Sequence, residues 1–248
     1  MAVAYSSIAI YGPPKIGKTL DVAATFSRAF FLLADPGGLT SVKAHLGYTP
    51  PHVELINLDD PFGEIMRAID QQVVLDIKAG KHTAIVIDTM SELADRILNV
   101  EDRLSKGNAR QSYPKTAQKI KAITRKLLMF PIWFVGIFHE QEPIADESGY
   151  IKGSLALPGS KLPFAIAGMF STVIHAVAMP GMTDSGRVYT CNSVDPHWVS
   201  GDRTGACMTR QDMDLRPIVW RMTHGEEPMP EWQPKVKATK EQQGGTTL

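Results

Sequence analysis

Residues 7–20 read SIAIYGPPKIGKTL, and they carry the strongest structural signal in the sequence. Ser7 to Tyr11 is a short apolar run typical of a buried strand, and it ends at a Gly-Pro-Pro turn. Gly12 to Thr19 fits the pattern Gly-x-x-x-x-Gly-Lys-Ser/Thr, and helical periodicity follows from Leu20 to Ala29. A strand, then this loop, then a helix is the context that the pattern requires.

The loop predicts a site for a nucleoside triphosphate. Backbone N–H groups of such a loop and the N-terminus of the following helix converge on a phosphate. Lys18 would place its charge beside the β- and γ-phosphates, and Thr19 would ligate Mg²⁺. We expect nine residues to bind the nucleotide: Gly12, Pro13, Pro14, Lys15, Ile16, Gly17, Lys18, Thr19 and Leu20.

A second Mg²⁺-linked group is expected at the end of a buried strand near this loop. Ala84 to Ile87 is an apolar run, and Asp88 follows it directly. Asp88 is therefore the candidate metal carboxylate. An aspartate here could also cap the helix that begins near Met90, and the two roles can coexist.

Hydrolysis needs a group that orients the attacking water, one strand further along the sheet. Asp35 ends the run Phe30 to Ala34 and is placed for this role, although Asp-Pro-Gly-Gly is also an ordinary turn sequence. Glu92 and Glu140 are the reserve candidates. His139 closes another apolar strand and could sense the γ-phosphate as a hydrogen-bond donor, or it could be a structural histidine.

Strands alternate with helices over the first 139 residues, which predicts an α/β fold with a mostly parallel sheet covered on both faces. Beyond His139, short β-prone runs predict extra strands, and we expect one domain over residues 1–224 and a disordered tail over 225–248. The expected further strands are Val53–Leu58, Thr83–Ile87, Ile132–Phe138, Ser171–Ala178, Arg187–Cys191 and Pro217–Met222. The expected further helices are Asp60–Gly80, Met90–Leu104 and Lys115–Phe130.

Composition narrows the class of protein. The 248 residues contain 26 Lys plus Arg and 26 Asp plus Glu, so the net charge is zero and a general basic coat for nucleic acid is excluded. The two cysteines, Cys191 and Cys207, do not suggest a disulfide framework or a zinc site. The apolar stretch Leu127 to Phe138 is too short to span a bilayer. We expect a cytoplasmic protein with no membrane partner.

One stretch departs from the equal numbers of basic and acidic residues in the whole chain. Residues 103–126 contain eight basic residues and no acidic one. Residues 106–115 read as a flexible loop with one aromatic residue, which suits contacts with phosphates and a stacked base. The alternative is a solvated helix face. The candidate nucleic-acid contacts are Arg103, Lys106, Arg110, Tyr113 and Lys115.

Arg203 lies in the turn Ser200 to Gly205 and could reach a phosphate of its own or of a neighbouring subunit, as an arginine finger does. The alternative is an arginine on a surface turn with no such role.

These motifs, in this order over roughly residues 5 to 222, resemble the RecA-like ATPases of bacteriophages, which include single-strand annealing proteins with an AAA-type domain. The carrying residues are the loop at 12–19, Asp35-Pro36-Gly37-Gly38, Ile85-Val86-Ile87-Asp88, Phe138-His139-Glu140 and Asp202-Arg203. The resemblance implies a RecA core, ATP and Mg²⁺, binding of single-stranded DNA, annealing or strand exchange, and assembly of a homo-oligomeric ring or filament.

The same resemblance implies roles for single residues. Asp35 stands where the family usually has a glutamate, which is one methylene longer. Residues 106–115 and 142–161 would correspond to two DNA-binding loops, and the second carries Asp146 and Glu147 with only two basic residues.

Two other functions stay open. A small-molecule or nucleotide kinase would share the phosphate-binding loop but needs an arginine-rich lid, and the segment after His139 is poor in arginine. A nucleotide-dependent assembly switch with little turnover is compatible with a short acid at Asp35.

Overall fold

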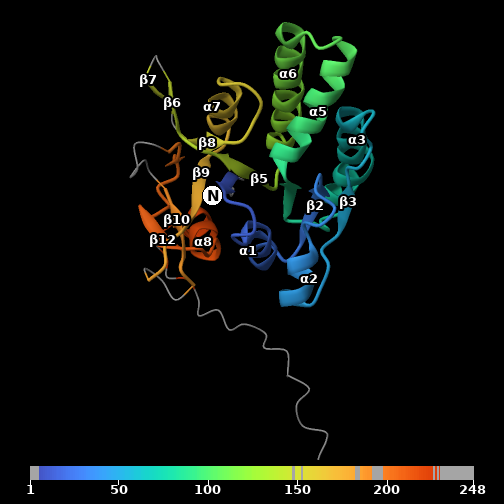
Figure 1. Ribbon diagram of the computed structural model, residues 1–248. Helices are drawn as coiled ribbons and strands as arrows, with labels where there is room; N and C mark the ends of the chain where they lie inside the picture. The colour runs from blue at the N-terminus through green and yellow to red at the C-terminus, as the bar shows by residue number, and fades with distance from the viewer. Residues whose placement is uncertain are drawn as a thin grey trace, which may run out of the picture.

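The computed structural model describes residues 6–146, 149–151, 153–181, 185–191, 198–225, 227 and 229. A parallel sheet of six strands forms its centre, in the spatial order β9-β1-β5-β4-β2-β3 (Figure 1). These strands are β1 (Ser7–Gly12), β2 (Ala29–Leu33), β3 (His52–Glu54), β4 (Ala84–Asp88), β5 (Trp133–Gln141) and β9 (Thr172–Ala178).

Short antiparallel strands extend the sheet beyond β9. The strand β10 (Arg187–Thr190) pairs with β9, and β12 (Arg210–Asp212) pairs with β10. Three more pieces are β11 (Gly201–Asp202) on β9, β8 (Ser154–Leu155) on β5, and the hairpin β6 (Ile144–Asp146) and β7 (Gly149–Ile151). The predicted α/β class, with a mostly parallel sheet and extra C-terminal strands, is confirmed.

Helices cover both faces of the sheet, as Figure 1 shows. One face carries α1 (Lys18–Thr25), α2 (Thr40–Leu46) and α8 (Arg216–His224), which bury Val22, Val42 and Ile218. The other face carries α3 (Pro61–Ala68), α5 (Met90–Leu104), α6 (Ala109–Leu128) and α7 (Leu162–Ala167). A π-helical turn, η1 (Ile69–Val73), joins α3 to α4 (Val74–Lys78). Strands buried on both faces explain their continuous apolar sequences.

Side-chain caps fix where the helices begin. Asp60 accepts a hydrogen bond from Gly63 N at 2.8 Å and starts α3, with Pro61 in its first turn. Thr89 accepts from Glu92 N at 3.1 Å and caps α5. The residue that caps α5 is thus Thr89, and the Asp88 side chain is available for another task.

Four expectations were wrong in detail. α6 begins at Ala109, not Lys115, because Asn108 caps it and the buried Ser112 and Thr116 hold its first turns around Pro114. Pro217–Met222 belongs to the helix α8 and not to a strand, since Pro217 fits the first turn of a helix. The expected helix Leu20–Ala29 ends at Thr25, and the strand at 53–58 shrinks to β3.

Segment 142–161, expected as a loop, contains β6, β7 and β8, and residues 147, 148 and 152 within it lie outside the described part. The expected tail at 225–248 also falls outside it, apart from residues 225, 227 and 229. Within the described residues, no helix combines the length and apolar character that a membrane crossing requires.

Candidate nucleotide-binding site

The carboxyl ends of β1, β2, β4 and β5 meet at one edge of the sheet, and a pocket of about 730 Å³ opens there. Strand register explains the meeting: Gly12 pairs with His139, and Asp88 pairs with Leu33 and Ile137. The pocket is lined by Lys18, Thr19, Asp35, Asp88 and His139 among others. Residues far apart in sequence thus line one cavity, as the end-of-strand positions predicted.

The loop at residues 12–19, which lines this pocket, requires glycine at two positions. Gly12 has φ +156°, and a side chain there would strike the backbone oxygen of Ala176. Gly17 has φ +109°, and a Cβ would lie 2.6 Å from Arg187 Nη1. Both positions therefore demand glycine.

Lys18 folds back over the loop. Its Nζ donates to Gly12 O at 2.8 Å and to Pro13 O at 2.7 Å, and the side chain is buried. Burial lowers the pKa of Lys18 to about 8, while Asp88 and Glu140 pull it upward. The ammonium is held where a loop of this kind receives phosphates.

Thr19 and Asp88 form the candidate metal pair. Thr19 Oγ1 donates to Asp88 Oδ2 at 2.8 Å. Burial raises the pKa of Asp88 to about 6, and the Thr19 hydrogen bond and the Lys18 charge oppose that rise. Among the described residues there is no group of three His, Cys, Asp or Glu side chains that could hold a metal by themselves. A hydroxyl beside one carboxylate fits Mg²⁺ that takes its remaining oxygens from phosphates and water.

Asp35 and His139 also line this pocket. Asp35 Oδ1 accepts from Gly37 N at 3.0 Å, and the backbone N–H groups of Ala34 and Asp35 both donate to Asp88 O. The backbone N–H of His139 donates to Ser91 Oγ at 3.0 Å. Burial, together with the charge of Lys18, lowers the pKa of the His139 imidazole.

The two reserve acids are held by other partners. Glu92 Oε1 accepts from Arg96 Nε at 3.0 Å. Glu140 Oε2 lies 3.0 Å from His175 Nε2. Asp35 thus remains the better placed of the three candidates for orienting water.

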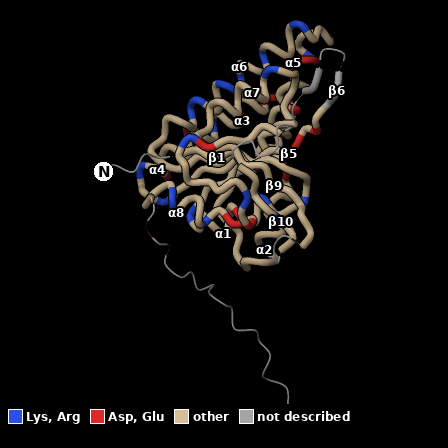
Figure 2. The backbone as a smooth tube through the Cα atoms, turned by 90° about the vertical axis from the view of Figure 1, so that its left-hand side faces the viewer, with Lys and Arg blue, Asp and Glu red and all other residues tan. Residues whose placement is uncertain are grey.

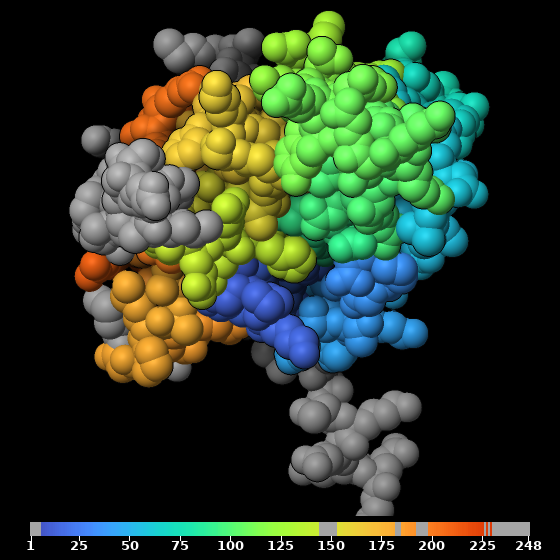
Figure 3. All heavy atoms as spheres, turned by 45° about the horizontal axis from the view of Figure 1, so that its top comes forward, coloured from blue at the N-terminus to red at the C-terminus, as the bar shows by residue number. Residues whose placement is uncertain are grey.

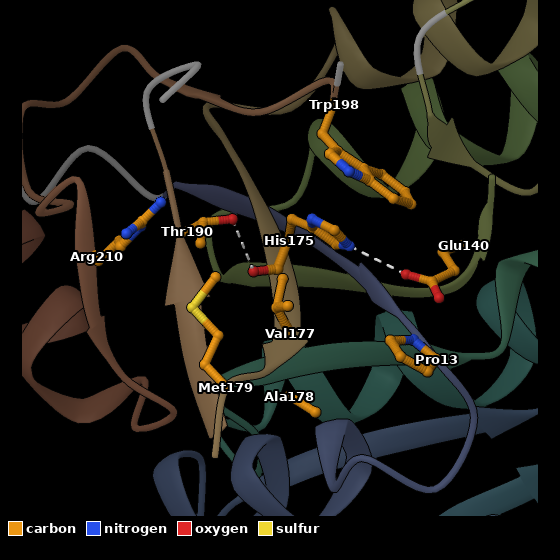
Figure 4. Close-up of a pocket in the computed structure, with 9 residues that line it drawn as sticks. All are labelled: Pro13, Glu140, His175, Val177, Ala178, Met179, Thr190, Trp198 and Arg210. Atoms are coloured by element: carbon orange, nitrogen blue, oxygen red, sulfur yellow. Dashed lines mark hydrogen bonds and ion pairs between the residues drawn. The ribbon is translucent and has the colours of Figure 1, made fainter. Parts of the chain in front are cut away.

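A second pocket, of about 290 Å³, is lined by Pro13, by Glu140 and by residues of β9 that include His175 (Figure 4). Figure 4 shows His175 between Trp198 and the Glu140 carboxylate. The His175 ring stacks on Tyr11, with 4.6 Å between ring centroids, and on Trp198 at 4.1 Å. This stack fixes His175, which in turn holds Glu140 beside the loop.

Sequence reasoning missed part of the first pocket. Arg187 on β10 donates from Nη1 to Ile16 O at 2.8 Å and lines the pocket, and Thr40, Ser41 and His45 on α2 line it too. No motif marks these residues, because an antiparallel strand and an unpredicted helix bring them to the loop.

Arg203 lies elsewhere. Its Nη2 donates to Gly168 O at 2.6 Å, and the neighbouring β11 pairs with Thr172 and Val173 at the beginning of β9. The nucleotide pocket is at the far end of that parallel set of strands, so a role for Arg203 at its own subunit's phosphates does not fit. Contact with a neighbouring subunit stays a prediction.

Four of the eight basic residues in this stretch pair with acidic side chains of the fold. Lys119 Nζ lies 2.5 Å from Glu101 Oε1, a carboxylate that is only 4% exposed, and Lys115 approaches the same side chain at 4.0 Å. Arg103 lies 3.6 Å from Asp59, and Lys126 lies 2.6 Å from Asp70. The expected loop at 106–115 is mostly helix, so Arg110, Tyr113 and Lys115 lie on α6.

The remaining cations of this stretch, Lys106, Arg110, Lys121 and Arg125, form no ion pair with the described residues. Figure 2 shows basic positions along the α5 and α6 pair, across the sheet from α1. Figure 3 views this side and shows α5, α6 and α7 as adjoining surfaces. Tyr113 is half-exposed and lies close to Gly159.

Comparisons with known proteins find a matching family model and similar solved structures. A family model described as AAA domain matches residues 4–204. No curated protein matches the sequence. A KaiC-like protein, PH0186, from Pyrococcus horikoshii OT3 is 13% identical over 75% of this chain and 77% of that chain, with a TM-score of 0.42.

An ATPase from the type III secretion system of pathogenic bacteria is 12% identical, with a TM-score of 0.50. The match covers 80% of this chain and 57% of that one. At this identity the likeness concerns the fold alone, and the fold is that of a RecA-like P-loop NTPase.

Proposed function

The chain belongs to the AAA-domain family of P-loop ATPases, and from that premise we propose that it hydrolyses ATP with Mg²⁺ and couples this reaction to single-stranded DNA in annealing or strand exchange. The observation that supports the ATPase reaction is one pocket lined by Lys18, Thr19, Asp88, Asp35 and His139.

Each of these side chains has a task in the reaction. Lys18 leaves the carbonyl oxygens of Gly12 and Pro13 to contact the β- and γ-phosphates. Thr19 and Asp88 would hold Mg²⁺, which would supply positive charge to neutralise the phosphates.

Asp35 has the role of orienting and activating water. Asp35 accepts a proton from water as the water oxygen bonds to the γ-phosphorus and the bond to the bridging oxygen of ADP breaks. His139 is placed to donate a hydrogen bond to the same phosphoryl group.

Support for DNA binding comes from Lys106, Arg110, Lys121 and Arg125, which form no ion pair within the described part of the chain. Lys106 stands in the turn between α5 and α6 with φ +52°, and Arg110 is in the first turn of α6. They form the electrostatic contact, and the paired Arg103, Lys115, Lys119 and Lys126 contribute less. Tyr113, half-exposed nearby, is the candidate stacking residue.

The proposal includes a homo-oligomer, either a ring or a filament. Arg203 is exposed and distant from its own nucleotide pocket, so a phosphate within its reach would belong to another subunit. We propose that the chain resides in the cytoplasm.

A slow assembly switch is the second candidate. Asp35 is shorter than glutamate and its Oδ1 already accepts from Gly37 N, so a water must come closer to be oriented. Such a switch would bind ATP and change its oligomeric state with little turnover.

Steady-state ATP hydrolysis with and without a single-stranded oligonucleotide tests the proposal. We expect Mg²⁺-dependent phosphate release that rises when DNA is added. Turnover that DNA does not change would remove the DNA proposal, while ATP-driven assembly without turnover would favour the switch. Transfer of the phosphate to a nucleotide would indicate a kinase.

A further inference from the structure

Strand β10 holds the phosphate-binding loop and its helix at two points. Arg187 Nη1 donates to Ile16 O at 2.8 Å, and Tyr189 Oη donates to Asp21 Oδ2 at 2.5 Å. Arg187 and Tyr189 are two residues apart on one strand, so their side chains leave the same face of β10. The two contacts lie on either side of the Gly-Lys-Thr sequence at 17–19. They therefore bracket the residues that would contact the phosphates.

We propose that Asp21 is a positioning residue of the nucleotide site, and that together with Tyr189 it holds the first turn of α1 so that Lys18 and Thr19 meet the phosphates and Mg²⁺. This inference rests on the proposed function, since it assumes that the triphosphate occupies the loop at 12–19. It gives a task to a carboxyl that the proposed reaction does not use.

The first turn of α1 depends directly on Asp21. The helix begins at Lys18, and the backbone N–H of Asp21 donates to Gly17 O at 3.0 Å, which closes that turn. Gly17 is the residue before the helix and has no side chain to cap it. A displacement of this turn would move Lys18 and Thr19 with it, and a shift of about 1 Å at a catalytic group can cost about 100-fold in rate.

Asp21 also holds the start of α8. The backbone N–H of Leu215, the residue before α8, donates to Asp21 Oδ2 at 3.1 Å. Figure 1 shows α8 beside α1. α8 follows residue 204, where the matched family model ends. Asp21 thus joins the helix of the phosphate-binding loop to a part of the chain beyond that match.

The two donors need an acceptor oxygen on Asp21 more than they need its charge. Burial raises the pKa of Asp21 to about 7, and the nearby charge of Asp214 adds to that rise. The hydrogen bonds from Tyr189 and Leu215 oppose it. The folded chain thus favours the uncharged carboxyl more than water does. Because both donors reach the same oxygen, an amide oxygen can replace it.

Steady-state ATP hydrolysis by tyrosine variants tests the positioning role. Tyr189→Phe removes the hydroxyl that holds Asp21. It should lower kcat about tenfold and change KM for ATP less than about twofold, because a misplaced first turn of α1 loses contacts that strengthen in the transition state. The matched control is Tyr48→Phe, since Tyr48 Oη donates to Ala23 O at 2.7 Å and holds the last turn of the same helix. Wild-type kcat in Tyr189→Phe, or an equal loss in Tyr48→Phe, would overturn the proposal.

Variants of Asp21 itself separate positioning from packing. Asp21→Ala removes the acceptor of both donors and should lower kcat at least about tenfold. Asp21→Asn keeps an acceptor oxygen and should hold kcat within about twofold of the wild-type value. A lower melting temperature in Asp21→Ala with unchanged kcat would mean a purely structural residue and would overturn the proposal. An equal loss of kcat in Asp21→Asn and Asp21→Ala would overturn its hydrogen-bond basis.

Hydrogen exchange in the unliganded chain gives a readout that does not depend on ATP turnover. Tyr189→Phe should accelerate exchange in peptides that cover residues 18–22, and Tyr48→Phe should not. If the wild-type chain does not hydrolyse ATP, the proposed function fails, and accelerated exchange in Tyr189→Phe would still support its hold on α1. Unchanged exchange in Tyr189→Phe would overturn the positioning role even where ATP turnover is confirmed.

Discussion

Charged groups in the nucleotide pocket and charged groups in the supporting scaffold are held in opposite ways. In the pocket, burial lowers the pKa of Lys18 to about 8 and raises that of Asp88 to about 6, so folding disfavours both charges. In the scaffold, Lys81, Gln72 and His82 surround Asp76 and lower the pKa of its carboxyl to about 2.

The difference indicates what each region is for. Buried charges without full compensation reduce stability, and such groups gather where a ligand completes their interactions. Scaffold acids such as Asp76 and Glu101 already have their partners within the fold. Substitutions should therefore affect function in the first region and stability in the second.

The largest expected effect is that of Lys18→Ala. We expect nucleotide binding and turnover to be lost, because no other described cation is held inside the loop in this way. The melting temperature should stay equal or rise, since the folded state holds the Lys18 charge at a cost near pH 7. Thermal unfolding and ATP hydrolysis measure the two effects. A large loss of stability would contradict the claim that Lys18 serves function and not the fold.

Asp35→Asn should lower turnover by about 10² or more and leave ATP affinity nearly unchanged, because water orientation is lost and phosphate contacts are kept. Asp88→Asn is the matched variant, and it should weaken Mg²⁺-dependent binding as well. If Asp35→Asn hydrolyses ATP at the wild-type rate, Glu92 or Glu140 becomes the better candidate.

Asp76→Asn should destabilise the fold by about 1.5 to 3 kcal/mol at pH 7 and leave ATP turnover intact. Because the pKa of Asp76 is lower in the folded state, its contribution is complete above the unfolded value near 3.8 and is lost as the pH falls toward 2. The difference between wild type and variant should thus shrink between pH 4 and pH 2. Chemical unfolding at several pH values measures it.

Asp70→Asn is the control for that experiment, since Asp70 is 57% exposed and pairs with Lys126 near the surface. Its effect should stay below about 1 kcal/mol. Equal losses of unfolding free energy in Asp76→Asn and Asp70→Asn would show that the buried partners of Asp76 add no stability.

The smallest effects are expected in the basic stretch. Lys106→Ala with Arg110→Ala should reduce the salt dependence of single-stranded DNA binding by about one unit per residue. Lys115→Ala with Lys119→Ala should change DNA binding less and stability more, because Glu101 would stay buried without a partner. If the variant with Lys106→Ala and Arg110→Ala binds DNA like the wild type at every salt concentration, the α5–α6 turn is excluded as the DNA contact.

Sequence predicted the parts of the site that local motifs and parallel strands specify. Lys18, Thr19 and Asp88 follow strand ends, and carboxyl ends of parallel strands meet at one edge, so their convergence needed no tertiary information. Arg187 comes from an antiparallel strand added after the parallel set, and α2 follows a turn with no strong helical signal. Neither contact could be inferred from spacing along the chain.

The prediction from the charge pattern of residues 103–126 was incomplete for a related reason. The run from 103 to 126 has no acid of its own, yet Asp59, Asp70 and Glu101 lie beside it in space. Pro114 and the β-branched residues after Pro217 likewise suggested a loop and a strand, where capping and burial produced helices. Packing between distant segments decided each case.

The position of the bound triphosphate tests the proposed site most directly. A structure of the chain with Mg²⁺ and a non-hydrolysable ATP analogue should show the phosphates within the loop at 12–19, the metal on Thr19 Oγ1, and Lys18 Nζ moved from Gly12 O to the phosphates. An analogue bound at saturating concentration outside this loop, with Lys18 still on the carbonyl oxygens, would contradict it.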